Sequence, residues 1–261
     1  MRTMPAIFLA HAAPTFAVES NATTDFWAAL PGWLPAVPKA VLCLSGHWET
    51  TQPEWSSSTA IQHDFYGFPD HLYRLGWPLL QDRKLSSWLE QRLVALGVEA
   101  SESARPLDHG VWVPLRAAWP EPTFPVFQLS LCTGCGPVWH VELGRKLAPL
   151  RDDGVLVVGS GGISHNLGRI DWRARENEAT PWAAAFMDAV DDAIAKGDTE
   201  ALCNPWQLPH GREAVPTLDH YLPLLVILGM AGEARLQRLH TGWGFGSLAM
   251  HSYGLGVEAA V

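Results

Sequence analysis

Three histidines in this chain each follow a short run of apolar residues. His11 ends the stretch "AIFLAH", His47 follows "KAVLCLSG", and His165 follows "GVLVVGSGGIS". Such continuous runs, rich in valine, isoleucine and leucine, are typical of strands that helices cover on both faces. Ligands of open α/β sheets bind at the carboxyl ends of the strands. The three imidazoles are therefore predicted to lie together at that edge of one sheet.

The chemistry that such a cluster suggests is metal binding. Neutral imidazoles are ligands for zinc, iron, copper and nickel, and sites that leave open positions serve both non-haem iron(II) and catalytic zinc. Two carboxylates are further candidates. Glu49 lies two residues after His47 and would face the same way on a continued strand, and Asp219 precedes His220. We expect His220 one turn into a helix that Thr217 caps.

Strands and helices alternate in the sequence pattern. The predicted strands cover 5–10, 39–45, 125–131 and 154–159, and the predicted helices cover 24–33, 82–96, 138–150, 181–196 and 218–230. This alternation predicts an α/β sandwich of one domain, residues 1–261, with a central, mostly parallel or mixed sheet flanked by helices. We expect residues 235–256 to add an antiparallel hairpin at the sheet edge.

Composition excludes several classes of partner. Hydrophobic residues make up 48% of the chain and charged residues 17%, which favours a packed core over disorder. The net charge is −9 and no run of lysine or arginine occurs, so neither nucleic acid nor an anionic membrane is expected as a partner. We interpret the N-terminal apolar stretch as a first strand rather than a signal peptide. Four cysteines do not suggest a disulfide framework, which favours a cytoplasmic location.

Three other motifs have weaker meaning. Cys132 and Cys135 have CxxC spacing, but no second pair accompanies them. We therefore expect them to be small, buried, apolar residues rather than a redox pair or zinc ligands. The glycine-rich stretch 159–162 lacks the lysine of a phosphate-binding loop, so we expect its backbone to pass close to a substrate. Segment 63–69 is either a lid that places Phe65 or Tyr66 over a ring or an ordered surface loop.

Six segments together resemble a known family. The class III extradiol ring-cleavage dioxygenases, and specifically the branch similar to DOPA 4,5-dioxygenase, have the same motifs in the same order between about residues 4 and 256. The segments are "LAHAAPT", "LSGHWET", "HDFYGFPDHLY", "LDHGVWVPL", "GSGGISHNL" and "DHYLPLL". One departure lies in the loop after the first histidine, where the family has Gly-Ser and this chain has Ala12-Ala13. The change concerns the hydrogen bonding of that loop to a substrate.

The resemblance implies a role for each histidine that matches a family motif. It implies a single α/β domain with one non-haem metal, held by His11, His47 and His220. It implies that His165 is the acid–base residue and that His109 is a second active-site histidine that contacts the substrate. Zinc in the isolated protein could draw in His165 as a fourth ligand.

The function that the resemblance implies is extradiol cleavage of an aromatic ring. The substrates would be O₂ and a small aromatic diol or aminophenol, and the working metal would be Fe(II). An alternative from the residues alone is a zinc hydrolase in which Glu49 is the base. A third class, a non-catalytic binding or metal-storage protein, would be marked by loss of a ligand, and every matched histidine is present.

Overall fold

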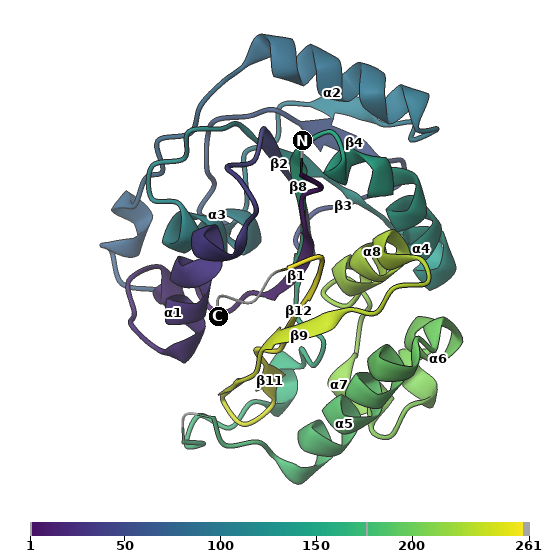
Figure 1. Cartoon of the computed structure of the whole chain (residues 1–261). Coiled ribbons are helices and arrows are strands. Elements are labelled where there is room, and N and C mark those ends of the chain that lie inside the picture. Colours follow the sequence, from purple (N-terminus) through teal and green to yellow (C-terminus); the bar gives the residue numbers. More distant parts are fainter. Residues whose placement is uncertain (1, 176, 258–261) are drawn as a thin grey trace.

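A mixed sheet of eight strands forms the centre of the computed structural model, which describes residues 2–175 and 177–257 (Figure 1). The strand order is β5-β4-β6-β2-β8-β1-β12-β9. Their bounds are β1 Ala6–Ala10, β2 Ala40–Ser45, β4 Glu54–Ser56, β5 Ser101–Ser103, β6 Val126–Leu129, β8 Val155–Gly161, β9 Gln237–His240 and β12 Ser252–Leu255. The neighbours β6, β2, β8 and β1 run parallel to one another. The predicted α/β fold with a mostly parallel or mixed sheet is confirmed.

Helices cover both faces of this sheet. Their bounds are α1 Ala22–Ala29, α2 Arg83–Ala95, α3 His109–Ala118, α4 Gly136–Leu147, α5 Pro181–Lys196, α6 Thr199–Cys203, α7 Gly211–Ala214 and α8 Leu222–Ala231. Helices α1 and α3 lie on one side of the sheet, and α4 and α8 lie on the other (Figure 1). Alternate residues of β1 follow this division, because Phe8 packs in one core while Ile7 and Leu9 pack in the other. Burial on both faces explains the continuous apolar runs.

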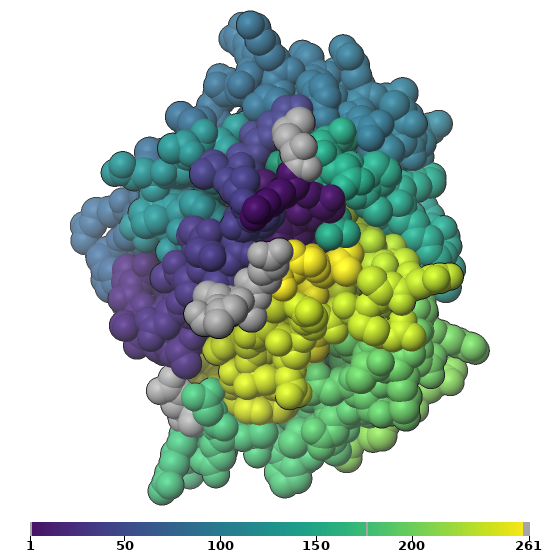
Figure 2. Space-filling view, in the orientation of Figure 1, coloured from purple at the N-terminus to yellow at the C-terminus, as the bar shows by residue number. Residues whose placement is uncertain are grey.

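Shorter elements complete the chain. Two small ladders are formed by β3 Glu49–Thr50 with β7 Leu131–Cys132, and by β10 Trp243–Gly244 with β11 Leu248–Ala249. The 3₁₀ helices are η1 Pro14–Ala17, η2 Leu30–Trp33, η3 Leu72–Arg74, η4 Ala148–Arg151, η5 Leu167–Arg169 and η6 Pro205–Gln207. The C-terminal strands β12 and β9 add antiparallel pairs beside β1, as predicted for 235–256. Accordingly, the purple N-terminal residues lie against the yellow C-terminal segment in Figure 2.

The predicted helix boundaries differ from the structure in two informative places. The helix expected over 218–230 begins at Leu222, because Pro223 stands in its first turn, so His220 lies in the turn before it. Helix α3 was not predicted at all. It contains Pro114 and is buried on nearly every side, so it shows neither the polar face nor the proline-free interior that reveals most helices.

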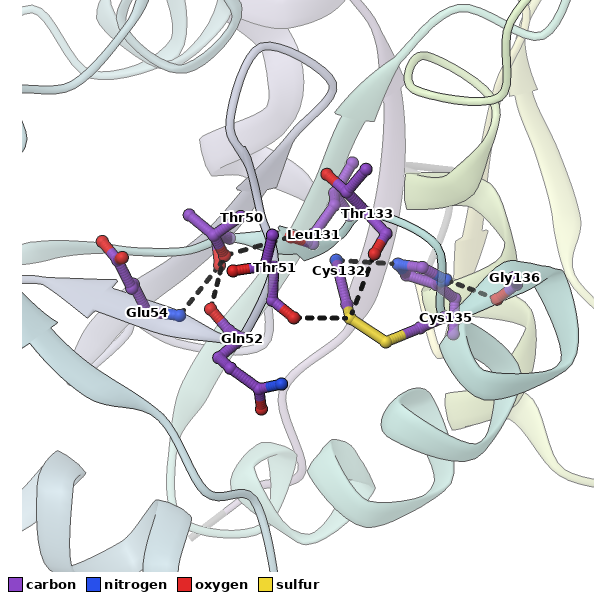
Figure 3. Close-up of a disulfide and its surroundings, with 11 residues drawn as sticks. Thr50, Thr51, Gln52, Glu54, Leu131, Cys132, Thr133, Cys135 and Gly136 are labelled. Atoms are coloured by element: carbon purple, nitrogen blue, oxygen red, sulfur yellow. Dashed lines mark hydrogen bonds between the residues drawn. A yellow bond between two sulfur atoms is a disulfide. The ribbon is translucent and has the colours of Figure 1, made fainter.

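The prediction that Cys132 and Cys135 are separate buried thiols is wrong. The two residues form a disulfide in the structure, at the turn that leads into α4 (Figure 3). This turn brings their Cα atoms to 5.5 Å, which lies within the range that a disulfide spans. Cys43 and Cys203 are free and buried.

Helix α8 is apolar along its whole length and crosses α4 at very short range. All ten of its residues are buried. The two helices approach most closely where Gly144 of α4 faces Val226 and Gly229 of α8, and a Cβ atom on Gly144 would lie 3.0 Å from the Cα atom of Gly229 and still closer to Val226 O. Among the described residues, no helix is both long enough and apolar enough to span a membrane.

We predict that Gly144→Ala destabilises the fold. Alanine favours an isolated helix over glycine by about 1 kcal/mol, but here its methyl group would overlap backbone, and overpacking costs about 1–3 kcal/mol. Denaturant unfolding should therefore give a lower free energy of unfolding. The control is Gly32→Ala, whose Cβ would meet no atom within 4 Å. A Gly144→Ala variant as stable as the control would contradict the close crossing.

Candidate metal centre

Three histidines meet at the carboxyl ends of the central parallel strands. His11 follows β1 directly, and His47 lies two residues beyond the end of β2. His220 comes from the turn before α8. The ring centroids are 4.7 Å apart for His11 and His47, 5.1 Å for His11 and His220, and 4.9 Å for His47 and His220. The predicted convergence of His11 and His47 at one sheet edge is thus observed, and the fold adds His220.

The ring of His11 is oriented by a chain of hydrogen bonds. Ser160 Oγ donates to Gly110 O and lies 2.9 Å from His11 Nδ1. Because the serine proton is already used, Ser160 accepts from His11 Nδ1–H, which leaves the lone pair on Nε2. His11 Nε2 is buried and has no hydrogen-bond partner among the described residues. An unpartnered basic nitrogen in a buried position is suited to a metal ion.

Carboxylates stand at the Nδ1 atoms of the other two rings, where His220 is hydrogen-bonded and His47 is within ion-pair distance. His220 Nδ1 bonds the carboxylate of Asp219. His47 Nδ1 lies 3.4 Å from Asp64 Oδ2 and 3.5 Å from Asp108 Oδ1. The Nε2 atoms of His47 and His220 are 3.0 Å apart. One nitrogen from each of the three histidines falls within 4.8 Å of the others, and this donor set fits one metal ion.

Burial and charge shift the protonation of this cluster. Burial, together with the neighbouring imidazoles, holds the pKa of His11 well below its usual value, so the ring is neutral. Burial also opposes the charged form of His47, but the carboxylates of Asp108 and Asp64 outweigh it and raise the pKa to about 9. Asp108 itself is fully buried, accepts hydrogen bonds from Ser45 Oγ and Gln128 Nε2, and has a lowered pKa despite its burial.

Asp64 joins His47 to His109. His109, the first residue of α3, donates its backbone N–H to Asp64 Oδ1, and its Nδ1 lies 2.9 Å from the same oxygen. The rings of His47 and His109 are 4.2 Å apart, and donor atoms of these two residues and Asp64 also lie within 4.8 Å of one another. The ring of Phe65 stands edge-on to His109 at 5.7 Å.

These contacts settle the interpretation of segment 63–69 in part. Phe65 is buried beside His109, whereas the side chain of Tyr66 is 92% exposed. The segment therefore packs one aromatic ring inward and supplies the carboxylate of Asp64, which the sequence reasoning did not single out. Asp108 was missed as well. The only sequence signal for the two residues was their position next to histidines in "HDFYG" and "LDHGV".

His165 lies beside the three histidines but outside the group of converging nitrogens. Its ring is stacked on that of His220, with centroids 3.7 Å apart and planes 7° apart. Its backbone N–H donates to Ala214 O at 2.9 Å, which fixes the residue in the loop after β8. Among the described residues, no side chain hydrogen-bonds either ring nitrogen. Burial and the adjacent His220 lower the pKa of His165 to about 3, so the ring is neutral at pH 7.

The glycines of 159–162 let the backbone around His220 approach strand β8 closely. A Cβ atom on Gly159 would lie 2.5 Å from Pro223 O, and one on Gly161 would overlap His220 O. Gly162 N donates to His220 O at 2.9 Å. The strand is therefore free of side chains where the turn that carries His220 packs against it. The predicted approach of this backbone to a substrate stays a prediction.

Glu49 is not part of the cluster. Strand β2 ends at Ser45, and a turn at residues 46–47 breaks the alternation of side chains that the prediction assumed. Glu49 is exposed on the separate strand β3 and joins no group of candidate ligands among the described residues. The expectation that a continued strand joins His47 to Glu49 is wrong. Asp219, the other carboxylate candidate, orients His220.

Comparison with known proteins shows the family to which the chain is similar. Residues 5–256 match the family model described as the catalytic LigB subunit of aromatic ring-opening dioxygenase. A 4,5-DOPA dioxygenase extradiol of Escherichia coli (strain K12) is 36% identical over 97% of this chain and 95% of its own. The protein of the same name from Beta vulgaris is 33% identical over 94% of each chain. The crystal structure of an uncharacterized protein from Escherichia coli K12 superposes with a TM-score of 0.81 at 33% identity, covering 97% of this chain and 100% of that one.

We predict that His11→Ala, His47→Ala and His220→Ala each lose tight metal binding while the fold survives. Each change removes one converging nitrogen, so the affinity for Co(II) should fall by more than the roughly 10–100-fold that outer partners contribute. Glu49→Gln should bind Co(II) as the parent does. Titration with Co(II) compares the affinities of the variants and the parent, and circular dichroism checks that each variant is folded. Full-stoichiometry, tight binding by a histidine variant would remove that residue from the ligand set.

Proposed function

The chain belongs to the family of aromatic ring-opening dioxygenases represented by the LigB catalytic subunit, and from this premise we propose that it is a non-haem iron(II) extradiol dioxygenase. The proposed substrates are O₂ and a catechol-type ring, in keeping with the DOPA named in the titles of its relatives. The observation that carries the proposal is the set of three imidazoles that each offer a nitrogen within 4.8 Å of the other two. Three imidazole ligands leave positions on a metal open for further ligands.

The proposed ligands are His11, His47 and His220. Bound Fe(II) would supply one centre at which both catechol oxygens and O₂ meet and through which electrons pass between them. Hydrogen bonds at Nδ1 orient the rings of His11 and His220, and two carboxylates stand at ion-pair distance from Nδ1 of His47, so the Nε2 side of each ring is left for a metal. Fixed orientation of this kind reduces the rearrangement that binding requires.

His165 is the proposed proton acceptor. Its ring is neutral, lies against the ligand ring of His220, and has nitrogens that no side chain among the described residues hydrogen-bonds. In the proposed reaction a ring nitrogen of His165 takes a proton from a substrate hydroxyl and returns it later, and the negative charge of the bound substrate must raise the low pKa of this ring for the transfer. The stacking contact keeps the imidazole beside the metal site without using either nitrogen.

His109 is the proposed substrate-contacting residue on the opposite flank. Asp64 holds its Nδ1 and backbone N–H, which leaves Nε2 as the atom that can contact a substrate oxygen. The Phe65 ring beside it contributes an apolar surface against which an aromatic ring can pack. This flank therefore combines an oriented polar atom with an aromatic wall.

The zinc hydrolase alternative lacks support from the structure. Its proposed base, Glu49, is exposed and stands outside the group of candidate ligands. The family, moreover, is one of ring-opening dioxygenases. Zinc remains a metal that the same three histidines can bind, with His165 as a candidate fourth ligand, and such a complex would not be the working form.

The test of this function is oxygen consumption by anaerobically reconstituted protein. Fe(II)-loaded protein should consume O₂ when a catechol such as DOPA is added and form a ring-opened, coloured semialdehyde, whereas the Zn(II)-loaded protein should do neither. An oxygen electrode and absorption spectroscopy measure both quantities. Absence of O₂ uptake across a panel of catechols and aminophenols, at confirmed iron occupancy, would contradict the proposal.

We predict that His165→Gln separates turnover from metal binding. The variant should keep Fe(II), because His165 stands outside the converging nitrogens, and kcat should fall by about 10²–10⁴-fold, the usual contribution of a positioned acid–base group. Iron content and O₂ uptake, measured on the same sample, make the test. Parallel loss of iron and activity would make His165 a ligand, and near-normal turnover would assign the proton to His109.

A further inference from the structure

The disulfide between Cys132 and Cys135 lies outside the histidine cluster and takes no part in the proposed reaction. Its two sulfur-bearing residues differ in exposure. Cys135 is exposed at the N-terminus of the twelve-residue helix α4, whereas the side chain of Cys132 is buried in β7 (Figure 3). An attacking thiolate can therefore reach the sulfur of Cys135 but not that of Cys132, and access decides which sulfur of a disulfide is attacked.

The CxxC turn has its own supports besides the disulfide. Cys135 N–H donates to Cys132 O at 3.3 Å. The buried side chain of His140 bridges the turn, because its Nδ1 donates to Gly136 O at 2.7 Å and its Nε2 accepts from Cys132 N–H at 3.3 Å. Burial lowers the pKa of His140, in keeping with a neutral ring that can donate and accept at once. Two reduced thiols would therefore stay close enough to pair again.

A disulfide that closes so short a loop contributes little to global stability. Cross-links stabilise mainly by restricting the unfolded chain, and the effect grows with the number of residues enclosed. Here the sequence separation is three residues. Stabilisation of the fold is thus a poor explanation for this disulfide. An exposed sulfur paired with a buried one is instead the arrangement found in reversible dithiols.

The disulfide borders the segment that follows His47. Strands β3 and β7 pair Glu49 with Leu131 and Thr50 with Cys132. Leu131 N–H donates to Trp48 O and Thr133 N–H donates to Thr50 O, both at 2.8 Å. These bonds tie the backbone immediately after His47 to the strand that carries the buried cysteine.

Two carbonyls lie within reach of the buried sulfur. Cys132 Sγ lies 3.7 Å from Thr51 O and 3.8 Å from Thr133 O (Figure 3). A thiol can donate its proton to one of these oxygens, whereas a disulfide sulfur has no proton to give. Reduction would release the link from β7 to α4, and donation to Thr51 O would add a hydrogen bond between β7 and the residue that follows β3.

We propose that Cys132 and Cys135 form a thiol–disulfide exchange site whose oxidation state is transmitted to the His47 segment. A thiolate of an external dithiol attacks Cys135 Sγ, the Cys132–Cys135 bond breaks, and Cys132 leaves as a thiolate that takes up a proton. The second thiolate of the dithiol then attacks its partner sulfur in the mixed disulfide and releases Cys135. Two electrons pass from the dithiol, which becomes a cyclic disulfide, to the protein.

The first experiment measures exchange on the metal-free protein. Wild-type protein is equilibrated with mixtures of reduced and oxidised dithiothreitol, quenched with acid and alkylated, and the peptide with both cysteines is quantified by mass spectrometry. We expect a reversible two-electron transition. A pair that never oxidises in these mixtures, or that never becomes reduced, overturns the exchange site.

Single variants test which sulfur is attacked. The thiol of Cys135 in Cys132→Ser should react with an aromatic disulfide reagent at least roughly tenfold faster than the thiol of Cys132 in Cys135→Ser, because only the former is exposed. The double variant Cys132→Ser/Cys135→Ser gives the background from Cys43 and Cys203. Equal rates, or faster reaction of Cys132, would overturn attack at Cys135.

The second experiment measures the coupling and does not depend on dioxygenase activity. Oxidised and reduced proteins, freed of reagent, are titrated with Co(II), whose visible spectrum reports the ligand geometry. We expect dissociation constants that differ by at least about fivefold, the lower end of typical coupling between sites. The double variant should bind Co(II) identically before and after the same treatment. Equal affinity and equal spectra for the two wild-type forms would overturn the coupling.

Discussion

The hydrogen bond that Gly162 N donates to His220 O holds together the two parts of the molecule on which the metal site depends. His11 and His47 come from the ends of strands in one sheet, and the register of that sheet brings them to the same edge. His220 arrives from a turn much later in the chain, so strand register alone cannot place it. The turn reaches its position because Gly161 has no side chain in its way. The position of the His220 nitrogen therefore depends on glycine at position 161 as well as on the histidine itself.

Charge is arranged around the cluster so that imidazoles face the metal position and the carboxylates lie behind them. Asp219 supports His220, and Asp64 and Asp108 stand at the outer nitrogen of His47. A carboxylate at that position makes the opposite nitrogen a better donor. His11 instead has a serine behind it, so its ring receives orientation without added charge. In the proposed function, a ligand set without a carboxylate suits an anionic catechol, whose oxygens a carboxylate ligand would repel.

The sequence predicted those parts of the site that depend on local pattern. Apolar runs located the central strands, and the rule that ligands bind at strand ends brought His11, His47 and His165 together. The residue-level argument failed for Glu49, because alternation along a strand holds only while the strand lasts, and a turn intervenes. Asp64 could not be found either, since its contact with His109 joins a loop to the start of a helix that is distant in the chain. Residues that act through such contacts have no spacing signature.

The two histidines outside the ligand set flank it on different sides, which gives their proposed roles a structural basis. His165 stacks on His220 and keeps both nitrogens free of other side chains in the described part of the chain, as a group that exchanges protons must. His109 stands next to His47 and has one nitrogen and its backbone fixed by Asp64, as a group that positions a substrate must. A ring bound between these flanks would meet the proposed proton acceptor on one side and an oriented ring nitrogen on the other. Both residues are histidines, so their proposed roles differ because Asp64 hydrogen-bonds His109 whereas no described side chain hydrogen-bonds the ring of His165.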